Sequence, residues 1–293
     1  MAPILVTGAT GNVGRAVVDV LVAAGVPVRR ALHDGSTDRA TSGQAEDVVF
    51  DFTRAATWAP AFDGVRSMLL VRPPALGNVR RDLIPALRAA RDAGVQHVVF
   101  LSLQGAETNP LVPHATVESW LRRSGMDWTF VRASFFFQNL STTHASDIRD
   151  RDEICVPAGA RATAFVDALD VAAVAAAALL DPDGHRDTAW TVTGPHALSY
   201  TEVAEVLSRV LERPVTYARP GLLRYARHAR RTLGMPGAMV LVTSAIYTAA
   251  RLGLAAGLTD DVRTVLGRAP IDLETFVRRE RTVWIPSPAG APA

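Results

Sequence analysis

The sequence contains no lysine, because all 31 of its basic residues are arginine. This absence excludes a Walker-type phosphate-binding lysine, a Schiff-base lysine and any catalytic tyrosine–lysine pair. Tyrosine is also scarce, and all of its occurrences lie in the C-terminal third: Tyr200, Tyr217, Tyr225 and Tyr247. Proton transfer and anion binding in the N-terminal half must therefore use other residue types.

Cysteine is nearly absent as well. The single Cys155 excludes an intramolecular disulfide and argues against a cysteine–histidine metal site. The chain enters an apolar strand at once, without the pattern of a signal peptide. We therefore expect a metal-free protein of the reducing cytoplasm.

Long apolar runs and an excess of one charge are missing too. The longest uncharged apolar stretch, Pro236 to Ala250, is too short to span a bilayer comfortably. A net charge of +2 does not suit nucleic-acid binding. With 293 residues, 48% hydrophobic and 20% charged, the chain fits one large soluble domain, alone or with a smaller appendage.

The first turn of the chain carries the strongest signal that is present. An apolar run, Ile4–Val6, precedes three glycines at three-residue spacing, Gly8, Gly11 and Gly14, and an apolar-periodic helix follows. A glycine turn between a strand and a helix lets the backbone approach a pyrophosphate at the helix N-terminus. The order predicts a dinucleotide site, and the alternative is a tight turn that binds nothing.

Strands and helices alternate through the N-terminal half. The expected strands are Ile4–Thr7, Val26–Leu32, Val48–Phe52, Ser67–Val71, His97–Ser102 and Trp128–Arg132. Helices are expected between most of them, including Arg80–Ala93 behind an Asn78 cap, and His114–Ser124. This pattern predicts an α/β fold, a Rossmann-type doubly wound parallel sheet covered on both faces.

The second half reads as a smaller, mostly helical C-terminal substrate lobe. Its expected helices include Asp170–Leu180, a Ser199–Glu202 capping box leading to Leu211, Gly221–Gly234, Gly237–Gly253 and Leu273–Arg281. The expected domains are a nucleotide-binding domain (1–155), the lobe interleaved with the sheet (156–286) and a disordered tail (287–293).

Several segments together resemble the NmrA-like branch of the atypical short-chain dehydrogenase/reductases. They are Thr7–Gly14, Phe100–Gly105, His114–Leu121, Ser124–Arg132, Phe136–Asn139, 165–172 and Gly194–Ala204. The resemblance implies a Rossmann fold and an NAD(P) cofactor. Members include ergot-alkaloid-type and quinone reductases, and redox-sensing regulators that bind the dinucleotide without turning it over.

Cofactor contacts follow from the glycine turn and from the carboxyl ends of the strands, where ligands lie in such sheets. The expected set is Gly8, Thr10, Gly11, Asn12, Val13, Gly14, His33, Asp51, Arg72 and Pro73. In the family pattern, His33 stands where an arginine binds the 2′-phosphate, and Asp51 matches an adenine-side contact. We expect NADP with NAD possible, because Arg15 and Arg30 are available to a 2′-phosphate while Asp34 suits a ribose.

The reactive end departs from the typical superfamily members. His114 occupies the tyrosine-like position and Glu118 the lysine-like position, so the usual proton relay is missing. Ser102 matches the family serine, and we expect it to hydrogen-bond a substrate oxygen or the nicotinamide ribose, or to be a turn residue. His114 is either a general acid with an ordinary pKa near neutrality or a packing residue. Glu118 is expected to cap or pair on its helix rather than act as a base.

Candidate substrate residues are Gln104, Phe135, Phe136, Gln138 and Asn139. The aromatic run would line an apolar pocket for a flat, hydrophobic small molecule. We predict an NAD(P)H-dependent reductase of a quinone, imine or ketone, a monomer or homodimer acting in secondary metabolism. The alternative is an NAD(P)-binding redox sensor with no turnover.

Overall fold

A fully parallel sheet organises the larger part of the molecule. The computed structural model describes residues 2–36 and 44–285, and within them the sheet order is β10-β6-β5-β4-β1-β2-β3. Its strands are β1 (Ile4–Val6), β2 (Val28–Leu32), β3 (Ala45–Val49), β4 (Ser67–Val71), β5 (His97–Leu103), β6 (Asp127–Ala133) and β10 (Thr188–Val192). All neighbouring strands run parallel, as the alternating pattern predicts.

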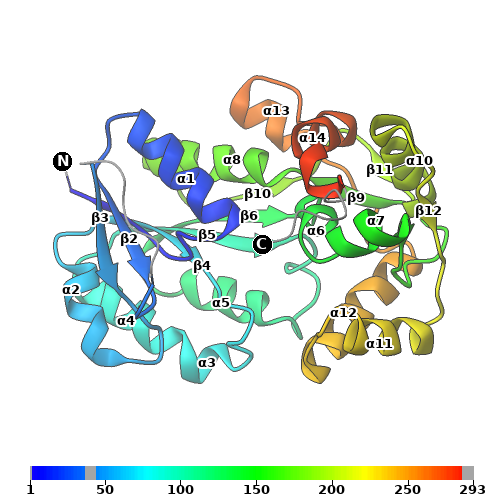
Figure 1. The fold of residues 1–293 in the computed structure, drawn as a ribbon. Helices are drawn as coiled ribbons and strands as arrows, with labels where there is room; N and C mark the ends of the chain where they lie inside the picture. Colours follow the sequence, from blue (N-terminus) through cyan, green and yellow to red (C-terminus); the bar gives the residue numbers. More distant parts are fainter. Residues whose placement is uncertain (1, 37–43, 286–293) are drawn as a thin grey trace, which may run out of the picture. The chain divides into compact units, whose positions relative to one another are not determined.

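Helices cover both faces of this sheet. Figure 1 shows α1 (Asn12–Ala23) and α8 (Ala168–Leu180) on one face, and α2 (Trp58–Phe62), α3 (Val79–Asp82), α4 (Ile84–Asp92) and α5 (Pro113–Leu121) on the other. Shorter pieces are η1 (Ala55–Thr57), α9 (Pro182–His185) and α13 (Asp261–Leu266). The core beneath α2–α5 is built from fully buried strand residues such as Leu5, Met68 and Phe100. The doubly wound Rossmann-type fold is confirmed.

The chain divides into two compact units. Unit 1 holds residues 1–133, 168–192 and 260–268, and unit 2 holds 134–167, 193–259 and 269–293. The chain thus leaves unit 1 after Ala133, ahead of the boundary expected at 155, and returns to supply α8, β10 and α13. The chain returns to unit 1 because Thr188–Val192 pairs with β6 as a strand of the main sheet, in parallel register Thr188↔Thr129. The expected tail at 287–293 lies outside the described residues.

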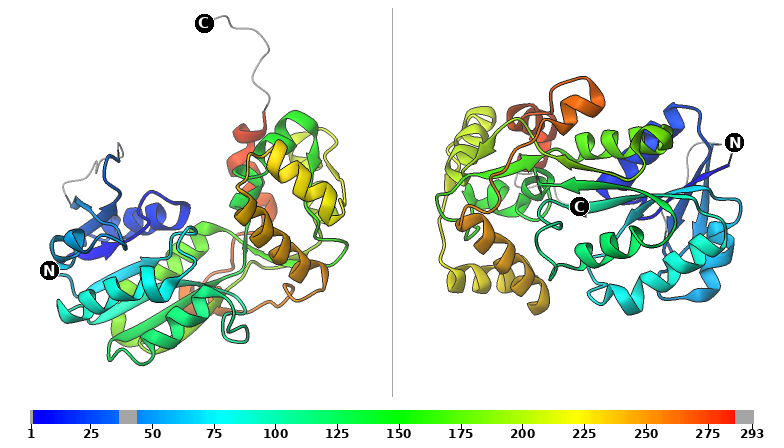
Figure 2. Two further views of the ribbon diagram at one scale, coloured as in Figure 1. Left: turned by 90° about the horizontal axis from the view of Figure 1, so that it is seen from below. Right: turned by 180° about the vertical axis from the view of Figure 1, so that it is seen from behind.

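Unit 2 combines two small sheets with helices. The strands β7 (Phe135–Phe136), β9 (Thr163–Val166) and β11 (Ala197–Leu198) form one sheet, and β8 (Glu153–Ile154) pairs with β12 (Thr216–Tyr217). The helices are α6 (Gln138–Ser141), α7 (Ala145–Arg151), α10 (Tyr200–Leu211), α11 (Leu222–Arg231), α12 (Gly237–Arg251) and α14 (Leu273–Glu280), with η2 (Arg281–Trp284). Figure 2 shows α11 and α12 lying side by side. Within the described residues, no helix combines the length and apolarity needed to cross a membrane.

Several expected elements differ at their ends, and two differ by more: one strand is shifted as a whole, and one helix is broken in two. The third strand runs over Ala45–Val49 instead of Val48–Phe52. Phe50 and Phe52 resemble strand residues because they are buried, but they lie beyond the strand end, with ring centroids 4.8 Å apart. The helix expected over Arg80–Ala93 is broken at Leu83, whose φ is −121°, and restarts as α4 with Pro85 in its first turn. Proline suits a helix start because it lacks the N–H that a helix interior requires.

Candidate functional site

The turn after β1 is held tightly against β4. Gly8 has φ +65°, and a Cβ atom there would lie 3.0 Å from the Cβ atom of Val71. The Thr7 hydroxyl donates to the Leu69 carbonyl at 3.0 Å and accepts from the Val71 N–H at 2.8 Å. These contacts fix where the backbone turns from the sheet into α1.

The third glycine closes the turn. A Cβ atom on Gly14 would lie 2.1 Å from the Gly8 carbonyl oxygen, so only glycine fits there. The Gly11 N–H donates to the same oxygen at 3.0 Å, and Gly11 starts α1 without a side-chain cap. Thr10, Gly11 and Asn12 are exposed, whereas Val13 and Gly14 are buried. An open helix start with this close backbone packing is the cradle that a pyrophosphate requires.

The arginines of β2 are engaged by the neighbouring strand. Arg29 pairs with Glu46 at 2.6 Å, and Arg30 pairs with Asp47 at 2.8 Å. Arg29 also donates to the Asp63 carbonyl at 2.6 Å. Arg30 therefore does not meet the expectation of an arginine available to a 2′-phosphate, because the β2–β3 pairing places an acid beside it.

Beyond the strand ends lies a second group of polar residues. His33 and Asp34 are exposed after β2. The Asp51 Oδ1 atom accepts from the N–H and the hydroxyl of Thr53, both at 2.7 Å, and these bonds lower the pKa of Asp51. Asp51 is thus an ionised turn residue, and its adenine-side role stays a prediction. Arg54, which the sequence reasoning did not select, lies 3.2 Å from Asp34.

At the end of β5 the expected serine is part of a buried network. The Ser102 hydroxyl donates to the Glu118 Oε1 atom at 2.7 Å. Arg132 grips both carboxylate oxygens of Glu118, at 3.0 and 2.6 Å, and this contact raises the pKa of Arg132. Glu118 is therefore a pairing residue, but its partners lie on β5 and β6 and not, as expected, on its own helix. Because the only Ser102 proton is engaged, Ser102 offers lone pairs to a donor instead of a proton to an acceptor.

His114 lies against Phe100, with ring centroids 5.8 Å apart. Burial, aided by nearby Arg72, lowers the pKa of His114 to about 4. The expectation of an ordinary pKa near neutrality is therefore wrong, since the half-buried ring is partly removed from water. At neutral pH His114 is an uncharged imidazole, able to donate only the single proton of the neutral ring.

Arg72, after β4, supports the loop that follows it. Its Nη1 atom donates to the carbonyls of Pro73 at 2.9 Å and Leu76 at 3.0 Å, and burial lowers its pKa. Within the described part of the chain, the buried Arg72 Nε and His114 Nδ1 atoms have no hydrogen-bond partner. The Gln104 N–H, one residue past β5, donates to the Ala133 carbonyl at 2.9 Å.

The remaining predicted substrate residues belong to unit 2. Phe135 and Phe136 are half-buried on β7, whereas the next ring, Phe137, is fully buried against Phe165 and Phe276. The Gln138 amide donates to Asp167 at 2.9 Å, so this side chain is held inside unit 2. Asn139 is exposed. No group of three or more histidine, cysteine or acidic side chains suited to a metal occurs among residues 2–36 and 44–285.

Comparison with known proteins agrees with this geometry. The NmrA-like family matches residues 2–228. The chain belongs to the NmrA-like family. It is 36% identical over 285 residues to an NAD(P)H azoreductase of Xenophilus azovorans, with 94% of this chain and 96% of the relative covered.

Two solved structures are similar over almost the whole chain. The Citrobacter sp. triphenylmethane reductase complexed with NADP(H) has a TM-score of 0.82 at 25% identity, covering 95% of this chain and 99% of the other. NmrA, a negative transcriptional regulator in complex with NADP, has a TM-score of 0.70 at 18% identity, with 95% of both chains covered. The second of these likenesses concerns the fold alone.

Proposed function

We propose that this NmrA-like protein is an NAD(P)H-dependent reductase of a flat, apolar, aromatic small molecule. The observation that carries the cofactor assignment is the turn at Gly8–Gly14, where the helix start packs on the Gly8 carbonyl too closely for any side chain. A reduced nicotinamide, when bound, supplies the hydride. The resemblance to an NAD(P)H azoreductase over nearly the whole chain supports oxidoreductase activity.

The chain's own residues then have defined tasks. The N–H groups at the start of α1 bind the pyrophosphate, with Gly8, Gly11 and Gly14 permitting the approach. The Ser102 oxygen, fixed by Glu118, accepts a hydrogen bond from a ribose hydroxyl or from the carboxamide. Uncharged His114, in the first turn of α5, and Arg72, just after β4, each provide a buried polar atom without a hydrogen-bond partner.

The proton chemistry points to a substrate that needs little acid. No tyrosine–lysine pair exists, Glu118 is locked by Arg132, and His114 is uncharged at neutral pH. Quinones, iminium ions and related conjugated acceptors take up hydride with little help from an acid, so that holding the reactants in place is the main task. The half-buried rings of Phe135 and Phe136 are the apolar surface proposed to contact such a substrate.

The decisive experiment follows NADPH and NADH oxidation at about 340 nm, the absorbance of reduced nicotinamides, with a panel of quinones, imines, azo dyes and aromatic ketones. Calorimetric titration of each dinucleotide accompanies it. Turnover with any acceptor supports the reductase and identifies its substrate class. Tight binding without turnover across the panel would favour the redox-sensor alternative, and absence of binding would refute the cofactor assignment.

A further inference from the structure

Two exposed side chains of opposite charge meet where β2 and β3 end. Asp34 lies two residues past β2, and Arg54 lies five residues past β3. Arg54 Nη1 and Asp34 Oδ2 are 3.2 Å apart, and the side chains are 54% and 68% exposed. In an open parallel sheet this edge is where the adenosine half of a dinucleotide lies.

The main chain at Arg54 is held firmly, although its side chain is exposed. The Arg54 N–H donates to the Asp51 carbonyl at 3.1 Å, and the Thr57 hydroxyl donates to the Arg54 carbonyl at 2.8 Å. The Trp58 indole N–H also donates to the Asp51 carbonyl, at 2.9 Å. The backbone of this turn is therefore fixed, whereas the exposed Arg54 guanidinium is able to exchange Asp34 for another partner.

The two arginines of β2 are already committed to other partners. Arg29 is bound to Glu46 and to the Asp63 carbonyl, Arg30 is bound to Asp47, and both arginine side chains are largely buried. The Arg54–Asp34 pair, in contrast, is exposed to solvent, where ion pairs contribute little stability and exchange readily. A phosphate dianion binds a guanidinium through two charge-assisted hydrogen bonds and is a stronger partner than a lone carboxylate.

We propose that Arg54 and Asp34 together select between NADPH and NADH. A 2′-phosphate would take Arg54 from Asp34, and the released carboxylate would repel the phosphate. A ribose diol would instead donate to Asp34 while Arg54 keeps its partner. Among the described residues, exposed His33 and the ionised Asp51 are further titratable groups at this corner. The inference rests on the proposed dinucleotide site at Gly8–Gly14.

Calorimetric titration with small probes tests this assignment without any turnover. Adenosine 2′,5′-bisphosphate and 5′-AMP differ only in the 2′-phosphate, and NADPH and NADH provide the full-length counterparts. We expect Arg54→Gln to weaken binding of both 2′-phosphorylated probes by about tenfold and to leave 5′-AMP and NADH unchanged. Asp34→Asn should weaken NADH binding and tighten NADPH binding, each by about threefold.

Arg91→Gln is the matched control, because Arg91 also forms a solvent-exposed pair, with Asp92 on α4, and this helix precedes the amino end of β5. It should change none of the four affinities. If the wild type binds dinucleotides and Arg54→Gln leaves the ratio of NADPH to NADH affinity unchanged, the assignment is overturned while the proposed function stands. Equal losses for 5′-AMP and the bisphosphate would also overturn it. If the wild type binds no dinucleotide, the proposed function itself fails.

Discussion

Gly14 is the residue at which the turn tolerates least change. Alanine is normally the better helix former, yet its Cβ atom at this position would lie 2.1 Å from the Gly8 carbonyl oxygen. Gly14→Ala should therefore push α1 away from the turn and weaken dinucleotide binding by at least about tenfold. Calorimetric titration with NADPH and NADH measures the effect.

Gly77→Ala provides the comparison for this prediction. A Cβ atom at Gly77 would meet nothing within 4 Å, and its φ is not in the left-handed region. Its binding and unfolding midpoint should match those of the wild type. Wild-type affinity in Gly14→Ala, with the fold intact by circular dichroism, would contradict the close packing of this turn.

The glycine turn was predictable from sequence, whereas the partners of nearby charges were not. Gly8, Gly11 and Gly14 sit in a local pattern of strand, turn and helix, which the chain reveals by spacing alone. The engagement of Arg30 by Asp47 depends on the lateral pairing of β2 with β3. Likewise, the lowered pKa of His114 follows from burial beside Phe100, which no local pattern encodes.

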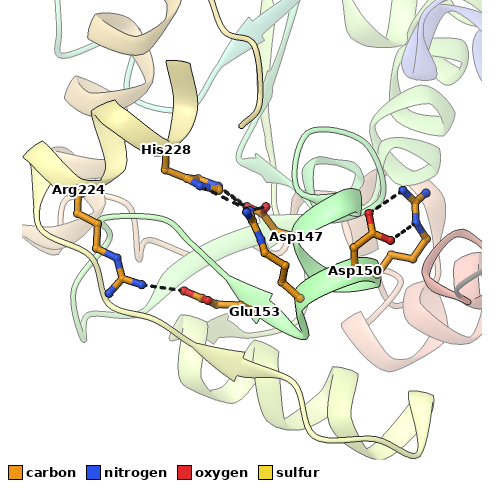
Figure 3. A network of polar contacts seen from close by, with 7 residues as sticks. Asp147, Asp150, Glu153, Arg224 and His228 are labelled. Atoms are coloured by element: carbon orange, nitrogen blue, oxygen red, sulfur yellow. Dashed lines mark hydrogen bonds and ion pairs between the residues drawn. The ribbon is translucent and has the colours of Figure 1, made fainter. Parts of the chain in front are cut away.

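Among the elements, α11 is held to α7 and β8 by polar contacts of its side chains. Figure 3 shows His228 pointing to Asp147 of α7, and Arg224 pointing to Glu153 of β8. The distances are 2.7 Å and 3.2 Å. Asp147 is fully buried and also binds Arg151, while burial and Arg151 lower the pKa of His228. The largely neutral imidazole thus donates its Nε2 proton to the carboxylate.

Replacing Asp147 should loosen this helix selectively. We expect Asp147→Asn to cost about 2 kcal/mol of unfolding free energy, because a buried hydrogen bond to a charged group is lost. Amide hydrogen exchange should accelerate in α11 and stay unchanged in α8. Asp150→Asn is the control, since Asp150 pairs only with its exposed neighbour Arg149 among the contacts shown. Equal exchange in both variants would show that Asp147 does not secure α11.

Local signals located some helices well and others poorly. The Ser199–Glu202 capping box was a reliable signal for the start of α10, because both hydrogen bonds of the box are formed within four residues. The helix ends at Leu211, as expected. The break at Leu83 was missed, although Pro85 two residues later is the signal that could have located it. The third strand was expected too far along the chain, because the apolar residues Phe50 and Phe52 are buried although they lie past the strand end.

At the scale of the whole molecule, buried histidines make stability depend on pH. Burial lowers the pKa of His97, His114 and His144 to about 4 from an ordinary 6.5. The unfolded chain therefore binds more protons between these values, so stability falls as pH falls from about 6.5 to about 4. Within this window, each histidine should lower the free energy of unfolding by about 1.4 kcal/mol for every pH unit of acidification.

Urea denaturation at a series of pH values measures this slope, and His97→Gln tests one contributor. His97 lies 2.9 Å from Thr129, whose own hydroxyl proton goes to the His185 carbonyl, so His97 donates from Nε2. In the His97→Gln variant, the slope of unfolding free energy against pH should decrease by the contribution of one histidine. The glutamine amide keeps a hydrogen-bond donor for the Thr129 hydroxyl. An unchanged slope would mean that His97 does not remain uncharged in the fold.

The division of the chain into units is the property that sequence reasoning located least well. The alternation of strands and helices predicted the parallel sheet, but Thr188–Val192 joins it only after an excursion of the chain through residues 134–167. No local pattern separates a strand of the main sheet from a strand of a smaller one. Which sheet a strand joins depends on its pairing with a strand far away in the sequence, and the sequence does not show the register of that pairing.

The late return of β10 has a consequence for synthesis on the ribosome. The strands β1 to β6 are complete once Ala133 has emerged, whereas β10 and the α8 helix that packs on α1 come afterwards. At roughly 5–20 residues per second, the nascent sheet waits several seconds with the outer side of β6 unpaired. An open strand edge is a template for pairing with other chains. Until residue 192 is released, the edge of β6 that β10 later covers is therefore open to pairing with other chains.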